Sequence, residues 1–496
     1  MTRTLLLAPL LGAVAVAGFA PLELFPLPIL ALAWLIRQWS ADITPRRAAL
    51  LGFGWGAGFF LAGVSWVYIS LHDVGGMAAP LALAATVAFC TWLALFPALV
   101  GYLYQRVAHP TGISCGHVDF WPAVFLLAGL WLLAEWLRGW LFSGFPWLAL
   151  GYSQTPPSPL AGYAAVLGSY GIAGLVALIA AALALGPKRR ATWILIVALL
   201  AGGQLLRGID WTQPVGAPLK VALLQGNIPQ TLKWDPERLP LSVQTYLGLA
   251  QNHPADLTVL PETAIPLFFD QLPREVRQAL THHGSTLLGM AVRHRDGGYV
   301  NGAVLIGADV ATQSYAKRHL VPFGEFVPPG FAWFFDYVRI PMSSFSAGPA
   351  HQLPLEIAGQ KIAPNICYED LFGEELLASL PAATLLINLS NTAWFGASLA
   401  QPQHLQIARL RAMETGRMML RATNTGITAA IAPDGRVLDQ LAPFTRGALR
   451  IEAQGFSGLT PYMRWGNTLA LLLALIAVIY AILPALLTVW RKRRSG

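Results

Sequence analysis

Long apolar runs separated by short polar stretches fill the first two hundred residues of this chain and return near its end. An apolar helix needs roughly 20 residues to cross a bilayer. Runs of about that length occur at 4–20, 22–39, 48–70, 77–105, 120–142, 158–186, 191–206 and 466–490, the second and seventh being short. The pattern therefore predicts an α-helical membrane domain of about eight transmembrane helices, seven of them before the insert that follows.

A different pattern fills residues 217–453, where short β-rich runs alternate with stretches of helical or polar periodicity. We expect strands at 219–227, 256–262, 285–294, 299–307, 361–369, 384–391, 427–435 and 447–453. We expect helices near 237–252, 273–283 and 402–420. The turn signals PDGRV (433–437) and RDGGY (295–299) predict that some neighbouring strands are antiparallel. Apolar strands alternating with helices predict a layered α/β sandwich.

Composition and charge agree with a membrane protein. Charged residues are 12% of the 496 residues, against about a quarter in a soluble domain. Basic residues gather at alternate span ends, namely Arg3, Arg37, Arg46, Arg47, Arg106, Lys188, Arg189, Arg190 and the tail 491–496. The positive-inside rule then places both termini in the cytoplasm and the long insert on the opposite side. Most of the net charge of +8 lies at these cytoplasmic loop ends, where it sets the topology and meets anionic lipid, so we expect no nucleic-acid partner.

This reading divides the chain into a transmembrane domain (1–210), an extracytoplasmic domain (217–453), a final transmembrane helix (464–490) and a basic cytoplasmic tail (491–496). The first apolar run could instead be a cleaved signal peptide, because AVAVAGFA ends in small residues. Another apolar run follows it at once, which favours a retained helical hairpin.

Cys367 raises the question of chemistry. By the predicted topology Cys90 lies in a span and Cys115 in a cytoplasmic loop, so Cys367 has no disulfide partner in the extracytoplasmic domain. Such a cysteine is either a buried inert residue or a reactive thiol. Considered by itself, the inert alternative is the commoner one.

Three segments at predicted strand ends favour the reactive alternative. LPETAIP presents Glu262, and NICYED presents Cys367. YAKRHLVPFGEFVP supplies Lys317 and Glu325. A thiol becomes a useful nucleophile when a base takes its proton and nearby donors stabilise the oxyanion that forms, and the backbone N–H of Tyr368 is one candidate donor. A single carboxylate or lysine is usually a solvated surface charge, but three such segments together predict a thiol-based catalytic site.

These segments resemble the Glu, Lys and Cys motifs of the nitrilase superfamily. With the membrane arrangement, the chain resembles the apolipoprotein N-acyltransferase family, a membrane-embedded branch of that superfamily. Further similar stretches are EWLRGWLFSGFPWLALGYSQ, QGNIPQTLKWD, LINLSNTAWFG and RATNTGITAAIAPDGRV. The resemblance implies a nitrilase-like α-β-β-α sandwich and a bacterial inner-membrane enzyme with its catalytic domain in the periplasm.

The same resemblance implies a ping-pong reaction without cofactor or metal. An acyl chain passes from a phospholipid, typically phosphatidylethanolamine, to the cysteine as a thioester. It then passes to the α-amino group of a diacylglyceryl-cysteine apolipoprotein, which becomes a mature triacylated lipoprotein.

The resemblance also implies residue roles. Glu262 corresponds to the general base and Cys367 to the nucleophile. Lys317 corresponds to the cation that holds the oxyanion and favours the thiolate, and Glu325 to a second acid that positions Lys317 or the base. The residues beside the nucleophile that complete the pocket correspond to Tyr368 and Glu369.

Several aromatic residues are candidate lipid contacts. Segment 328–349 is either a loop packed on its own domain or a lid that dips into the lipid interface through Trp333 and Phe334. Trp234 is a candidate to line the mouth for acyl chains, and Trp147 is a candidate lipid contact in the loop after the fifth span.

Glu135 and Arg138 lie three residues apart on one face of a predicted span and can pair there. The sequence leaves open whether they tether helices or contact a lipid head group.

Two other functions compete with acyl transfer. An amidase for small soluble amides would need its spans only as an anchor, and seven spans before the domain are too many for that. A transporter with an inert Cys367 should show inverted repeats and charges within its spans. The sequence shows no repeat and few such charges.

Overall fold

A computed structural model describes residues 2–111, 119–230, 237, 239–294, 297–308, 310–333 and 344–494. The chain divides into two compact units, and each is made of segments that are separate in the sequence. The helical unit comprises Met1–Ser65, Leu83–Ile209 and Trp465–Gly496. The sheet unit comprises Trp66–Ala82 and Asp210–Arg464.

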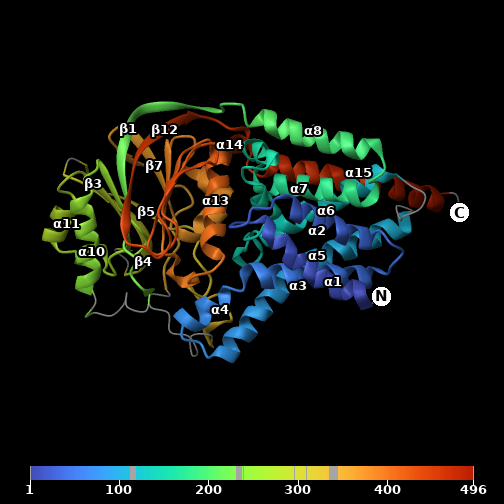
Figure 1. Ribbon diagram of the computed structural model, residues 1–496, viewed down its shortest axis with the longest axis horizontal. Coiled ribbons are helices and arrows are strands. Elements are labelled where there is room, and N and C mark those ends of the chain that lie inside the picture. Colours follow the sequence, from blue (N-terminus) through green and yellow to red (C-terminus); the bar gives the residue numbers. More distant parts are fainter. Residues whose placement is uncertain are drawn as a thin grey trace. The chain divides into compact units, whose positions relative to one another are not determined.

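Long apolar helices build the helical unit (Figure 1). They are α1 (Thr2–Ala15), α2 (Pro26–Trp39), α3 (Pro45–Val64), α5 (Ala79–Thr111), α6 (Phe120–Arg138), α7 (Ala164–Leu185), α8 (Arg190–Leu206) and α15 (Thr468–Arg494). Within the described residues, four helical segments are long and apolar enough to cross a membrane: Pro45–Val64, Ala79–Val107, Phe120–Arg138 and Pro159–Leu185. The chain is therefore a membrane protein, and the full set of eight spans stays a prediction.

Two predicted spans extend too far. The span at 120–142 ends at Arg138, and a 3₁₀ turn, η3 (Leu141–Ser143), follows it. The span at 48–70 ends at Val64, after which α4 (Val67–Ile69) and the π-helical turn η2 (Ser70–Val74) belong to the sheet unit.

Contacts inside the sheet unit account for the second error. The Ser70 hydroxyl donates to the Trp394 carbonyl oxygen at 2.8 Å, and the rings of Trp66 and Phe395 pack with centroids 4.6 Å apart. The apolar residues after α3 are thus used in packing against η11 (Thr392–Phe395) instead of lengthening the span.

Two six-stranded sheets form the centre of the sheet unit. The first has the order β12-β1-β2-β3-β4-β5, with bounds β1 (Thr212–Gln225), β2 (Leu257–Leu260), β3 (Ser285–Arg293), β4 (Tyr299–Ile306), β5 (Gln313–Ala316) and β12 (Gly447–Gly458). The second has the order β11-β10-β9-β8-β7-β6, with bounds β6 (Leu355–Ile357), β7 (Gln360–Ile366), β8 (Leu385–Ser390), β9 (Met419–Thr423), β10 (Ala429–Ile431) and β11 (Val437–Gln440).

Each sheet mixes parallel and antiparallel pairs, as predicted. The interior pairs β1/β2, β2/β3, β7/β8 and β8/β9 are parallel. The hairpins predicted at RDGGY and PDGRV are confirmed as the antiparallel pairs β3/β4 and β10/β11.

Helices cover the outer face of both sheets, which gives the α-β-β-α order. Inward side chains such as Leu223 and Ile387 fill an apolar core between the sheets. A second core lies between the first sheet and helices α10 (Leu239–Asn252) and α11 (Arg274–Leu280). A third lies between the second sheet and α13 (Ala400–Thr415), and Figure 1 shows these helices on opposite sides of the sheets.

Two predicted elements end earlier than expected because the backbone turns left-handed. The helix predicted at 402–420 stops at Thr415, where Gly416 caps it with φ of +60°, and β9 begins three residues later. The strand predicted at 361–369 stops at Ile366, where Cys367 has φ of +54° and starts the 3₁₀ turn η9 (Cys367–Leu371).

Candidate active site

Four strands deliver polar groups to one edge of the paired sheets. Glu262 lies two residues after β2, while Lys317, Cys367 and Asn391 directly follow β5, β7 and β8. Strand β5 is antiparallel to β4, which is antiparallel to β3, so β5 ends at the same edge as β2. The carboxyl ends of the strands thus gather the predicted catalytic residues.

A buried ion cluster surrounds the Lys317 ammonium. Its Nζ lies 2.8 Å from Glu325 Oε2 and 3.5 Å from Glu262 Oε1, and the lysine side chain is 1% exposed. Burial acts to lower the pKa of Lys317, but the charges of Glu325 and Glu262 outweigh it and hold that pKa above its usual value. Lys317 is therefore a fixed cation.

Asn301 on β4 links the two acids, and the sequence analysis missed it. Its Nδ2 donates to Glu262 Oε1 and to Glu325 Oε1, both at 2.7 Å. The backbone N–H of Asn391 donates to Glu262 Oε2 at 2.9 Å. The only hint of Asn301 in the sequence is a polar residue within an apolar strand, and nothing in the sequence marks a backbone donor.

Cys367 lies beside this cluster and is 8% exposed. Burial raises the pKa of its thiol, the Glu262 charge raises it further, and Lys317 acts in the opposite direction. The net pKa is well above the usual range for a thiol, so the resting cysteine is protonated at neutral pH. The predicted influence of Lys317 toward thiolate is present but smaller than the effect of burial, so the thiol needs a base when it reacts.

Glu369 connects the two strand ends. Its Oε1 accepts from the Tyr315 hydroxyl at 2.8 Å and from the Arg318 N–H at 2.7 Å, while its Oε2 accepts from the Ile366 N–H at 2.6 Å. Burial raises the pKa of Glu369 to about 7, although Lys317 and the hydrogen bonds lower it. Glu369 thus ties the Lys317 strand end to the Cys367 strand end.

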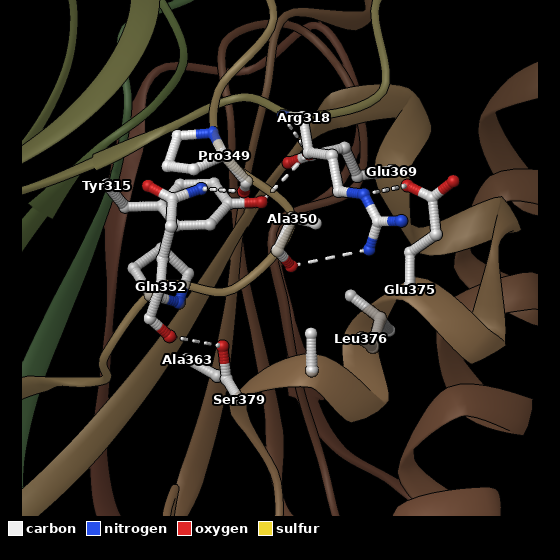
Figure 2. Close-up of a pocket in the computed structure, with 12 residues that line it drawn as sticks. Tyr315, Arg318, Pro349, Ala350, Gln352, Ala363, Glu369, Glu375, Leu376 and Ser379 are labelled. Carbon is white, nitrogen blue, oxygen red and sulfur yellow. Dashed lines mark hydrogen bonds and ion pairs between the residues drawn. The ribbon is translucent and has the colours of Figure 1, made fainter.

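A pocket lies next to this link (Figure 2). Glu369 lines it together with Tyr315, Arg318 and Glu375, and Figure 2 shows Arg318 reaching toward Glu375 and the Ala350 carbonyl. Among the described residues, the lining includes none of the predicted catalytic Glu, Lys and Cys side chains. This pocket is distinct from the ion cluster.

Three further predicted site residues lie within the described part of the chain. Tyr368 is half-buried and its ring packs on Phe372, 5.1 Å between centroids. Trp333 is 54% exposed and lies near Phe331, 6.1 Å between ring centroids. Trp147 is buried in the helical unit, and its lipid contact stays a prediction. Two further predicted lipid contacts, Trp234 and Phe334, lie outside the described residues.

Glu135 and Arg138 hold the loop that follows α6. Glu135 accepts from the Leu150 N–H at 3.1 Å and from the Trp131 indole at 2.9 Å. Arg138 Nη1 donates to the carbonyls of Phe145 and Trp147 at 2.6 and 2.7 Å. Within the helical unit, these buried charges therefore fix a loop.

Comparisons with known proteins agree with both halves of the chain. Residues 220–454 match the model of the carbon-nitrogen hydrolase family, and residues 11–182 match the model of the apolipoprotein N-acyltransferase N-terminal domain. Fold and site thus define a membrane enzyme of the carbon-nitrogen hydrolase class.

Three relatives that are similar over nearly the whole chain are named apolipoprotein N-acyltransferase. The protein from Nitrosomonas europaea is 50% identical, covering 92% of this chain and 93% of its own. The protein from Chromobacterium violaceum is 47% identical, covering 99% and 94%. The protein from Ralstonia nicotianae is 43% identical, again covering 99% and 94%. The chain belongs to the apolipoprotein N-acyltransferase family.

Proposed function

We propose that this chain moves a fatty acyl chain from a phospholipid, through a thioester on Cys367, to the amino-terminal diacylglyceryl-cysteine of apolipoproteins. The names of the relatives support the acceptor and the N-acylation. The apolar helices support a donor taken from the membrane, for which phosphatidylethanolamine is the proposed lipid. The observation that carries the proposal is the strand-end cluster, where Glu262 and Lys317 lie close enough to Cys367 for their charges to act on its thiol.

In the first half-reaction, Glu262 takes the proton from the Cys367 thiol while the sulfur attacks the ester carbonyl of the phospholipid. Lys317 stabilises the oxyanion that forms. When the intermediate collapses, the carbon–oxygen bond breaks, Glu262 returns the proton to the leaving lyso-lipid oxygen, and the thioester remains. The protonated resting thiol is consistent with this order of events.

In the second half-reaction, the α-amino group of the lipoprotein attacks the thioester carbonyl, and Glu262 accepts a proton from the amine. The new amide forms as the carbon–sulfur bond breaks, and the proton passes to the leaving sulfur. A thioester suits this step because it is more reactive toward amines than an oxygen ester. Glu325 and Asn301 hold Glu262 and Lys317 in position through both steps.

The basic residues at the span ends support an orientation with both termini in the cytoplasm and the catalytic domain in the periplasm of the bacterial inner membrane. In this arrangement the chain spans the membrane eight times. The match of residues 11–182 to a family domain argues against a soluble amidase that uses its helices only as an anchor.

A test of the proposal is to incubate the purified enzyme with phosphatidylethanolamine alone, because a ping-pong first step needs no acceptor. We expect an acyl adduct on Cys367 by mass spectrometry, released by neutral hydroxylamine. A peptide with diacylglyceryl-cysteine and a free amine should discharge the adduct, and its N-acetylated form should not. Cys367→Ala is the control and should not load. An acyl group on Cys90 or Cys115, or normal transfer by Cys367→Ala, would overturn the proposal.

A further inference from the structure

The turn that carries Cys367 has a backbone conformation that needs support. A φ of +54° costs a non-glycine residue free energy, and such residues persist only where the surroundings enforce the conformation. The short turn η9 contains two consecutive acids, Glu369 and Asp370, and both are buried. Glu369 faces the end of β5, as described above, whereas Asp370 has other partners.

Asp370 fastens the turn in a different direction from Glu369. Its Oδ2 accepts from Arg421 Nη1 on β9 at 2.6 Å, and its Oδ1 lies 2.7 Å from His404 Nε2 on α13. Asp370 is 0% exposed, and the residues Arg421 and His404 are each 1% exposed. The turn is thereby joined to an interior strand of the second sheet and to the helix that covers it.

Asp370, Arg421 and His404 lie close to Cys367. The His404 ring interacts with the backbone of Cys367. Asn388 Nδ2 also donates to the Cys367 carbonyl oxygen at 3.2 Å. The charges of Asp370 and Arg421 both act on the thiol, and with opposite signs. The hydrogen bonds of these side chains run to one another and to the turn that carries Cys367.

A buried ion pair is not required for stability as such, since well-packed apolar residues often serve equally well in its place. The Asp370–Arg421 pair holds the turn in which Cys367 has a positive φ, which indicates a role beyond stability. We infer that Asp370, Arg421 and His404 form a positioning network that holds the Cys367 turn in its reactive conformation. This inference rests on the proposed role of Cys367 as nucleophile.

The test uses the full-length Asp370→Asn variant. The rate of acyl-enzyme formation from phosphatidylethanolamine in a single turnover should fall about a hundredfold, because small displacements of a nucleophile have effects of that size. The KM for the donor should not change. The pH profile of Cys367 alkylation by iodoacetamide should move to lower pH, because the variant keeps the Arg421 cation but loses the anion that opposes thiolate. The charged groups that act on this thiol are Glu262, Lys317, Glu325, Asp370 and Arg421.

Loss of stability must be separated from loss of positioning. Asp370→Asn leaves Arg421 buried and unbalanced, which also weakens the fold. The double variant Asp370→Asn/Arg421→Gln removes both charges, so its thermal unfolding temperature should return toward that of the wild type while acylation stays slow. If the acylation rate of the double variant equals that of the wild type, the network serves only stability and the inference is overturned. This comparison decides the matter even if the single variant does not fold.

A matched control lies on α13. Arg411 and Glu414 form an equally buried ion pair with 2.9 Å between Nη1 and Oε2. Glu414→Gln should lower the unfolding temperature and leave both the acylation rate per folded molecule and the alkylation profile unchanged. If Glu414→Gln slows acylation as much as Asp370→Asn does, the inference fails. The alkylation profile needs no acyl transfer, so its result stands apart from the Cys367→Ala test of the proposed function.

Discussion

Each unit contains a set of buried charges that combines acidic and basic residues, and the two sets have different roles. In the sheet unit, Lys317 is surrounded by the carboxylates of Glu262 and Glu325 beside a thiol. In the helical unit, Glu135 and Arg138 bind mainly the backbone of the loop after α6. Burial of a charge therefore does not by itself identify a catalytic site. The groups that contact a buried charge determine its role. A carboxylate beside a thiol can exchange a proton with it, whereas a carboxylate bound to backbone N–H groups only holds the chain in place.

The sharpest test of this comparison replaces the glutamate in each set. Glu262→Gln should slow both half-reactions about 10²- to 10⁴-fold, because one group handles every proton. Glu135→Gln should instead lower the free energy of unfolding by about 1–3 kcal/mol, since it weakens buried hydrogen bonds. Single-turnover acylation and thermal unfolding in detergent measure the two effects. Near-normal turnover by Glu262→Gln would disprove its assignment as the base.

Replacing the cations gives the next largest effect. Lys317→Met should slow acyl-enzyme formation about a hundredfold or more, because it removes the cation that stabilises the oxyanion. Arg138→Met should reduce stability and leave the rate per folded molecule unchanged. The comparison breaks down if Arg138→Met slows the chemical step as much as Lys317→Met.

Glu369 is a buried carboxyl group whose protonation should make the stability of the protein depend on pH. Its pKa of about 7 lies above the usual 4.5, so between these values the folded state binds more protons than the unfolded state. The contribution of Glu369 to stability is therefore fully present below about pH 4.5 and is lost as the pH rises through 7. In Glu369→Gln, the fall in unfolding free energy between these pH values should be smaller, by at most about 1.4 kcal/mol per pH unit. Chemical denaturation at several pH values measures it, and identical slopes in both proteins would refute the assignment.

The smallest effect concerns the exposed aromatic residues. If Trp333 contacts lipid, Trp333→Ser should weaken the use of a membrane-embedded donor more than that of a short-chain soluble ester, by about threefold to tenfold. Leu353→Ser is the control, because Leu353 is an apolar residue of the same unit that is 88% exposed. Equal losses on both substrates would favour a structural loop.

Much of the sandwich could be predicted because its long strands are continuous apolar runs between turn signals. Strands β5, β6 and β11 contain only three or four residues each, which is too few to show a period. Strand β9 was hidden because it follows α13 after a single left-handed glycine. Helix periodicity alone could not reveal that stop.

The candidate site was predictable where a residue type itself carries chemistry. Glu262, Lys317 and Cys367 follow strands in motifs that can be read from the sequence, and the structure brings them together. Asn301 and Asp370 were missed, because their importance comes from what the fold places opposite them. An amide within a strand and an acid beside a motif look ordinary until their partners are known.

The segment Trp66–Ala82 limits how this protein can be cut into separate fragments. It belongs to the sheet unit, although more than a hundred residues of the helical unit separate it from the rest of that unit in the sequence. Any continuous stretch of the gene that encodes the complete sheet unit therefore also encodes residues 83–209 of the helical unit. A fragment covering 210–464 would lack the Ser70 hydroxyl bound to Trp394 and would expose the Phe395 ring that Trp66 covers. The two halves of this enzyme are interleaved along the polypeptide, so they cannot be exchanged between proteins as a simple cassette.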